Sequence, residues 1–255
     1  MTPQDASLRS LAIAAPAFNE AAGIEAFVRS WLETLSRKVG LQYAEIVVCN
    51  DGSRDDTGAI LDRLQAESPL VRPVHLARNR GAAQAMAAAI AHTTADWVLL
   101  LDSDGQFPPG CLDVFERARR DMPSARAFVG ARTKKDDSTF ARVGAWTTTR
   151  ALNTLWSTQY EDLSSACQLL DGRLLRSLPI EARGLNYSVE ISARLLECGV
   201  RPVQVAIEHV ARPAGRSTRT LVRSTFERAS FVGYFAARRA LINAGVLADP
   251  RGMTP

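Results

Sequence analysis

The amino-acid sequence predicts an α/β fold, with a mostly parallel central sheet flanked by helices and a helical extension at the C-terminal end. Short and almost continuously apolar runs alternate with helix-patterned segments, which is typical of strands covered on both faces. The chain has 255 residues, of which 46% are hydrophobic and 23% are charged. This size and composition suffice for a large core and exclude a disordered chain or a coiled coil.

Five strands are predicted in the first half of the chain from apolar runs at residues 11–15, 46–49, 74–76, 97–101 and 127–129. The segments between them predict helices, at residues 24–35, 60–64, 82–91 and about 109–120. In sheets of this kind ligands bind beyond the carboxyl ends of the strands. We therefore expect functional residues in the loops after residues 15, 49 and 101.

From about residue 134 the alternation weakens. The pattern there predicts helices at residues 140–156 and 188–198, a strand at 203–207 and a basic helix from about 218 to 244. No internal repeat or low-complexity linker interrupts the chain. One domain with a subregion in the second half is therefore the expected organisation.

Charge and composition narrow the classes of protein. The net charge of +4 suits an anionic substrate, nucleic acid or an acidic membrane surface without choosing among them. No segment is apolar enough to span a bilayer, and residues 1–11 lack a secretory signal pattern, so we expect a cytoplasmic protein. The cysteines and histidines are scattered without ligand spacing, which favours reduced thiols over disulfides or a zinc site.

An acidic loop follows the fourth predicted strand and reads Asp102-Ser103-Asp104-Gly105-Gln106. Carboxylates two positions apart on an extended segment point the same way and can reach one cation. Oxygen ligands of this kind suit Mg²⁺ or Mn²⁺, which complete their shells with substrate phosphates. Two aspartates and a glycine are also ordinary turn residues, so the position at the ligand edge decides in favour of a metal site.

The loop after the second predicted strand reads Asn50-Asp51-Gly52-Ser53. Asp51 is expected to accept hydrogen bonds from a base or ribose. Asp55 or Asp56 is expected to cap the helix that follows.

The loop after the first strand carries Phe18, Asn19 and Glu20. Asn19 fits the cap of the next helix, and Glu20 fits the positive end of that helix. The ring of Phe18 fits an apolar wall for a planar base.

These loops, in this order, resemble those of the inverting family 2 glycosyltransferases of GT-A fold, and within them the dolichyl- and polyprenyl-phosphate sugar transferases, including dolichol-phosphate mannosyltransferases. The motifs that carry the resemblance are Pro16-Ala17-Phe18-Asn19-Glu20, Asn50-Asp51-Gly52-Ser53, Asn79-Arg80-Gly81 and Asp102-Ser103-Asp104-Gly105-Gln106. They span about the first half of the chain and are specific only in combination. Phe18 stands where the family more usually has tyrosine, which keeps the ring and removes a hydroxyl.

The resemblance implies a metal-dependent hexosyltransferase with a UDP- or GDP-linked sugar as donor and polyprenyl phosphate (dolichyl or undecaprenyl) as the favoured acceptor. It implies a GT-A domain over residues 1–217, with a nucleotide-sugar half at about 1–132 and an acceptor half at about 133–217, before a basic amphipathic helix and tail at 218–255. The implied nucleotide-sugar contacts are Pro16, Phe18, Glu20, Asp51 and Asp102. The implied ligands of Mg²⁺ or Mn²⁺ are Asp102, Asp104 and Gln106.

The acceptor decides whether a general base is needed. A phosphate monoester is already anionic near neutral pH, whereas a hydroxyl must lose its proton to a carboxylate. The candidates for that base are Asp104, Asp162 and Glu190, and Glu190 fits equally well as the structural partner of an arginine. The resemblance adds Arg132 as a catalytic candidate.

A basic segment near the C-terminal end resembles the Arg-x-x-Gly-x-Ser segment of lipid-phosphate transferases. Arg212, Arg216 and Ser217 are therefore expected to hold an acceptor phosphate, for which arginine is the preferred donor. Aromatic residues mix with arginines downstream, at Phe226, Phe231, Tyr234 and Phe235. They predict either a helix lying on an anionic membrane surface or, more commonly, a helix whose aromatic side chains pack on the core.

Other functions stay open at this stage. One alternative is a glycosyltransferase that acts on a soluble hydroxyl, in a saccharide or small metabolite. A nucleotidyltransferase would share the acidic loop but would show a glycine-rich, basic phosphate loop near the N-terminus. A non-catalytic nucleotide- or nucleic-acid-binding protein is the alternative of another class. No nucleic-acid-reading motif is visible, so we expect no nucleic-acid partner, and oligomeric state is not predicted.

Overall fold

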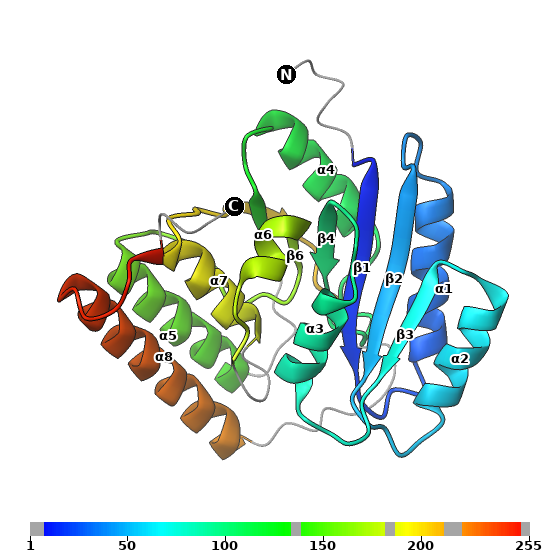
Figure 1. Cartoon of the computed structure of the whole chain (residues 1–255), viewed down its shortest axis with the longest axis horizontal. Coiled ribbons are helices and arrows are strands. Elements are labelled where there is room, and N and C mark those ends of the chain that lie inside the picture. Colours follow the sequence, from blue (N-terminus) through cyan, green and yellow to red (C-terminus); the bar gives the residue numbers. More distant parts are fainter. Residues whose placement is uncertain (1–7, 134–138, 182–186, 212–220, 251–255) are drawn as a thin grey trace.

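A seven-stranded sheet lies at the centre of the computed structural model, which describes residues 8–133, 139–181, 187–211 and 221–250 (Figure 1). In chain order the strands are β1 (Ser10–Ala17), β2 (Tyr43–Asn50), β3 (Val71–His75), β4 (Trp97–Leu100), β5 (Ala127–Arg132), β6 (Gln168–Asp171) and β7 (Val203–Ile207). Their order across the sheet is β3-β2-β1-β4-β6-β5-β7. All neighbours are parallel except β6, which runs antiparallel to both β4 and β5. The predicted mostly parallel α/β sheet is confirmed.

The helices form a layer on each face of this sheet. They are α1 (Ile24–Ser36), α2 (Thr57–Glu67), α3 (Ala82–Ala91), α4 (Cys111–Asp121), α5 (Thr139–Trp156), α6 (Gly172–Ser177), α7 (Tyr187–Glu197) and α8 (Leu221–Asn243). Buried side chains of α1, α2 and α4 share one core cluster, and those of α3, α6 and α7 share the other. Within the described residues, α5 and α8 lie side by side and pack against α7 through a third cluster.

The apolar run of β1 serves both faces of the sheet. Leu11 and Ile13 belong to the cluster under α1, while Ala12 and Ala14 belong to the cluster under α3. Small side chains on the second face let the alanine-rich α3 approach β1 closely, and these two elements are in extensive contact. A strand buried on both sides therefore reads as a continuous apolar run in the sequence.

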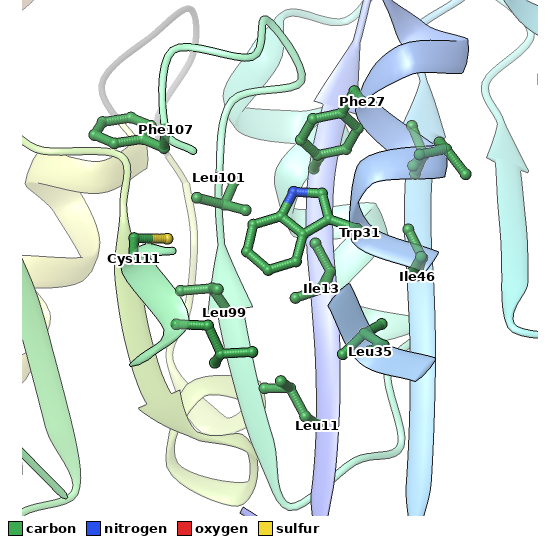
Figure 2. Close-up of a cluster of buried hydrophobic side chains, with 14 of the residues drawn as sticks. Leu11, Ile13, Phe27, Trp31, Leu35, Ile46, Leu99, Leu101, Phe107 and Cys111 are labelled. Carbon is green, nitrogen blue, oxygen red and sulfur yellow. The ribbon is translucent and has the colours of Figure 1, made fainter. Parts of the chain in front are cut away.

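The larger cluster anchors the acidic loop at both of its ends. Trp31 is fully buried and points from α1 toward the sheet (Figure 2). Leu101 and Phe107, which flank residues 102–106, belong to the same cluster. The polar loop is thus held between two buried apolar side chains.

Two elements were not predicted from the sequence. Strand β6 and the short helix α6 occupy residues 168–177, to which the apolar pattern assigned no element. Strand β6 has four residues, three of them buried, and its antiparallel direction is set by its partners rather than by its own sequence.

Helix α8 packs its aromatic side chains on the core. Phe235 is fully buried, with its ring centroid 5.9 Å from that of Trp156 and 4.8 Å from that of Phe231. For Phe235 the prediction of core packing is confirmed, and Phe231 packs beside it half-buried, whereas Tyr234 is 42% exposed. Contact of this helix with a membrane stays a prediction. The side chain of Phe226 lies outside the described residues, as does the predicted boundary at residue 217. None of the helices in the described part of the chain is both long and apolar enough to cross a membrane.

Candidate functional site

Parallel pairing brings the three predicted loops to one edge of the sheet. Ala17 is paired with Asn50 at the ends of β1 and β2, and Ala14 is paired with Leu100 at the end of β4. The loops are also bonded to one another: the Asp51 amide donates to the Ala17 carbonyl, and the Ser103 hydroxyl donates to the Pro16 carbonyl at 2.8 Å. Residues 16–20, 50–57 and 101–106 therefore form one continuous surface at the carboxyl ends of the strands.

Asp51 joins this surface to the loop that precedes α3. Its two carboxylate oxygens accept the backbone N–H groups of Arg80 at 2.7 Å and Gly81 at 2.8 Å. The residue is only 1% exposed, and burial raises the pKa of this carboxyl while the two N–H donors oppose that shift. Asp51 is thus fixed at the edge where a nucleotide was predicted, and its carboxylate also has a structural role.

Gly52 allows the sharp turn directly after Asp51. Its φ is +64°, and a Cβ atom there would lie 2.6 Å from the backbone of Arg78. Both observations require glycine, because other residues would be strained and would collide with the neighbouring chain.

Asn19 does not cap the following helix as predicted. Helix α1 begins at Ile24 with Gly23 at the N-cap position. Asn19 instead adopts a left-handed conformation, with φ +55°. Its amide donates to the Ser53 hydroxyl, and its side-chain oxygen accepts the Arg54 amide. A short polar side chain before a helix can bond either to that helix or to a neighbouring loop, and tertiary structure selects the second.

Glu20 and the aspartates before α2 continue this connection between loops. The Glu20 amide donates to the Thr57 hydroxyl at 2.9 Å. Asp55 accepts the Thr57 amide through one oxygen and the Ala21 amide through the other. Asp55 therefore fulfils the predicted capping role. Asp56 occupies the N-cap position without a capping bond from its side chain.

The acidic loop is held by contacts to α7 and to the chain after β7. The Tyr187 hydroxyl donates to Asp102 at 2.6 Å, and Asp104 accepts the Gln106 amide at 3.1 Å. The Gln106 side-chain amide donates to the Val210 carbonyl at 3.2 Å. Asp102, Asp104 and Gln106 are all half-buried. In the described part of the chain Asp102 has no cationic partner, so its negative charge is available to a ligand.

The donor set fits a hard divalent cation that also binds a substrate. No group of three or more His, Cys, Asp or Glu side chains among the described residues is placed to hold a metal. Asp102 and Asp104 supply two carboxylates, and Mg²⁺ is ordinarily bound by one or two carboxylates together with substrate phosphates. The residues therefore fit a metal that arrives with a diphosphate rather than a permanent structural metal.

The structure joins two catalytic candidates as an ion pair. Arg132, at the end of β5, donates through Nε to Asp162 at 2.8 Å. Asp162 is 1% exposed and also accepts the amide and the hydroxyl of Ser164. An aspartate bound in this way orients the guanidinium and is poorly suited to take a proton from a substrate.

Glu190 lies in a buried network instead of at the loop edge. Both of its oxygens accept the Glu181 amide, at 3.0 and 3.1 Å, and Arg194 lies 3.5 Å away. Arg194 also pairs with Glu197 and bonds to the Tyr234 hydroxyl of α8. This arrangement corresponds to the structural role that the sequence left open for Glu190.

The remaining candidates are placed in part. Pro16 is buried, and Phe18 is half-buried beside the loops described above. Arg212, Arg216 and Ser217 lie outside the described residues, but Val210, which bonds to Gln106, is the last described residue but one before them. Sequence reasoning missed Tyr187 and Ser103 as supports of these loops, although Ser103 lies within one of the motifs that carried the resemblance.

Comparison with known proteins identifies the class. The family model for glycosyl transferase family 2 matches residues 12–175, so the chain belongs to this family. The resemblance drawn from the loops is confirmed. The matched residues include the carboxyl ends of strands β1 to β5, the acidic loop and Asp51.

Particular relatives match part of the chain. The bactoprenol glucosyl transferase of Shigella phage SfX is 38% identical over 98 residues, which are 38% of this chain and 32% of that protein. The undecaprenyl-phosphate 4-deoxy-4-formamido-L-arabinose transferase of Klebsiella pneumoniae is 34% identical over 103 residues, or 40% of this chain and 31% of that protein. The matched stretches thus span about a third of these relatives.

A solved structure confirms the fold over most of the chain. Glucosyl-3-phosphoglycerate synthase from Mycobacterium tuberculosis in complex with UDP superposes with a TM-score of 0.69 at 20% identity, covering 93% of this chain and 83% of that one. Another structure of that protein, with Mn²⁺, UDP-glucose and glycerol 3-phosphate, gives a TM-score of 0.68 at 20% identity, covering 93% and 82%. The GT-A type of α/β fold is therefore confirmed.

We predict that Asp51→Asn destabilises the protein by about 1–3 kcal/mol, because an amide cannot accept both N–H groups and leaves one buried donor unsatisfied. Urea unfolding measures this difference. Asp56→Asn is the matched control, since its side chain is exposed and makes no capping bond, and it should change the stability by less than about 0.5 kcal/mol. Equal stability of Asp51→Asn and the wild type would contradict the structural role of Asp51.

Proposed function

We propose that this protein is a metal-dependent, inverting glycosyltransferase that moves a sugar from a nucleotide diphosphate sugar to polyprenyl phosphate. The observation that carries the proposal is the convergence of Asp51, Asp102 and Asp104 at one sheet edge in a chain of glycosyl transferase family 2. Asp51 and the 16–20 loop lie toward the nucleotide, and the acidic loop lies toward the diphosphate. Either UDP or GDP fits this arrangement.

The metal would be Mg²⁺ or Mn²⁺, and its protein ligands would be Asp102, Asp104 and the side-chain oxygen of Gln106. When bound, it supplies positive charge that stabilises the diphosphate leaving group. The Tyr187 hydroxyl orients Asp102 by donating to one of its oxygens. Gln106 binds Val210 through its amide nitrogen and so holds the acidic loop against the chain that leads to Arg212.

The surroundings of the acidic side chains favour a phosphate acceptor. Asp162 accepts from Arg132, and Glu190 accepts from the Glu181 amide and Arg194, so neither is a ready proton acceptor. A phosphate nucleophile needs no base, because it is ionised near neutral pH. Arg132, oriented by Asp162, then provides a fixed cation at the same edge for a phosphate of the donor or acceptor.

The acceptor side of the proposal rests on the relatives and on the basic segment. The names of two relatives refer to bactoprenol and undecaprenyl phosphate, both polyprenyl carriers. Arg212, Arg216 and Ser217 would hold the lipid phosphate. Arg212 comes two positions after Val210, whose carbonyl accepts the side-chain amide of Gln106 in the acidic loop.

A lipid acceptor requires a surface that meets the membrane, and α5 offers one. Val143 and Trp146 are 52% and 61% exposed. Arg150 is also exposed, and it lies on the same side of the helix because it follows Val143 by seven residues and Trp146 by four. Helix α5 follows β5, whose carboxyl end carries Arg132 at the site edge. Apolar and aromatic side chains next to a cation suit the interface of an anionic bilayer, so the protein would be cytoplasmic with peripheral contact to the membrane.

Transfer assays test the function. Purified protein with Mn²⁺ or Mg²⁺ is given UDP- and GDP-linked sugars with polyprenyl phosphate or soluble saccharides, and nucleoside diphosphate release is followed. We expect transfer to the lipid phosphate, reduced at least about 100-fold in Asp104→Asn because charge stabilisation of several kcal/mol is lost.

Asp96→Asn is the matched control for this assay, because Asp96 is an exposed aspartate at the opposite end of β4, and it should keep full activity. Transfer only to a soluble hydroxyl would replace the proposed acceptor. Full activity in Asp104→Asn would overturn the metal assignment, and binding of nucleotide without any transfer would favour a non-catalytic protein.

For membrane contact, we expect Trp146→Ala and Val143→Ala to lower co-sedimentation with phosphatidylglycerol vesicles, Trp146→Ala by about tenfold, because each change removes apolar surface from the interface. Val39→Ala is the control. Val39 is 100% exposed and lies just before the amino end of β2, at the sheet edge opposite to the site. If all three variants bind vesicles as the wild type does, α5 is not the contact surface.

A further inference from the structure

A line of hydrogen-bonded side chains runs from helix α2 to the predicted nucleotide loop. It passes through His75, the last residue of β3. The Nε2 atom of His75 lies 2.9 Å from Asp62 Oδ1, and its Nδ1 atom lies 3.1 Å from the side-chain nitrogen of Asn50. Asn50 ends β2 and directly precedes Asp51, so His75 acts on the loop through Asn50.

The hydrogen bonds determine where the protons lie. The side-chain oxygen of Asn50 accepts the Ser53 amide at 3.0 Å, which directs the Asn50 NH₂ group toward His75. The Nδ1 atom of His75 must then be an acceptor without a proton. The proton of the neutral imidazole is on Nε2 and is donated to Asp62.

Packing keeps the two side chains in this position. Gly58 lies in the first turn of α2, and a Cβ atom there would come 2.9 Å from the Asn50 side-chain nitrogen and 3.7 Å from the His75 ring. A larger residue at this position would have to displace the Asn50 side chain. Asn50 itself is 7% exposed, so its bonds are largely shielded from water.

We propose that His75 is a positioning residue for nucleotide binding, which sets the loop after β2 by accepting a hydrogen bond from Asn50. The effect extends to the loop after β1, because the Ser53 hydroxyl accepts the Asn19 amide at 2.9 Å. Both loops are those assigned to the nucleotide, so the inference rests on the proposed function.

The contact exists only with the neutral imidazole. A second proton, on Nδ1, would place two donors face to face, because the Asn50 NH₂ group points at this nitrogen. Rotating the Asn50 amide by 180° would only move the conflict, since its NH₂ group would then face the Ser53 N–H. The carboxylate that contacts the imidazole is Asp62 of α2. Asp51 is next to Asn50 on the chain, but its oxygens are bonded to Arg80 and Gly81.

Equilibrium binding of UDP and GDP in the presence of Mn²⁺, measured by calorimetry at pH 8, tests the inference. His75→Leu removes the acceptor and should weaken binding of the nucleotide about tenfold. His75→Asn keeps an acceptor oxygen near the Nδ1 position. It should therefore restore binding to within about twofold of the wild type.

Two further variants make the test specific. Gly58→Ala should weaken nucleotide binding several-fold although it removes no polar group, since its Cβ displaces Asn50. His92→Asn is the matched control: His92 is exposed and contacts the Ala88 carbonyl of α3, so this variant should bind nucleotide as the wild type does. In transfer assays, His75→Leu should raise the KM for the donor and leave kcat nearly unchanged.

The outcomes separate the inference from the function on which it rests. If the wild type binds nucleotide and His75→Leu binds equally well, or if His75→Asn binds as weakly as His75→Leu, the role of His75 is wrong and the proposed function stands. If the wild type binds neither UDP nor GDP, both are wrong. Should His75→Leu fail to fold, Gly58→Ala and His75→Asn replace it in the test. Wild-type binding of nucleotide by Gly58→Ala, or loss of binding in a folded His75→Asn, would then contradict the role of His75.

Discussion

The two hydrogen bonds from Arg80 and Gly81 to Asp51 are the interaction on which the site depends. They bind the loop after β2 to the loop that begins α3, and the Asp51 amide binds the same loop to β1. A carboxylate with two backbone donors is one of the stronger arrangements available to a buried acid. Without it, the parallel strands would still end at one edge, but the loops beyond them would not share a fixed geometry.

The carboxylates proposed for catalysis or metal binding divide into two groups by their partners. Asp162 and Glu190 are buried and pair with arginines, so they organise Arg132 and the contact between α7 and α8. Asp102 accepts from a neutral tyrosine hydroxyl and keeps its charge for a ligand. Because a metal with a diphosphate needs negative charge and a phosphate acceptor needs positive charge, this division suits transfer between two phosphate-bearing substrates.

The strands, the main helices and the three loops could be predicted from the sequence because apolar periodicity and turn residues are local signals. Strand β6 could not, since the direction of a four-residue strand depends on β4 and β5. Asn19 was assigned to a helix cap because its alternative partner, Ser53, is distant in sequence. The pairing of Arg132 with Asp162 and the contacts of His75 likewise need the folded chain, whereas Asp102 and Asp104 could be proposed from their spacing together with their place after a predicted strand.

The central claim is that the acidic loop and the loop around Asp51 together bind a nucleoside diphosphate with a divalent metal. Calorimetric titration of UDP and of GDP into the protein, at constant pH with Mn²⁺ and then with a chelator, measures this directly. The account predicts that one of the two binds and that Mn²⁺ strengthens its binding by at least about tenfold, because Asp102 and Asp104 would hold a metal that also neutralises charge on the diphosphate. Binding of equal strength with and without metal, or no binding of either nucleotide, would contradict it.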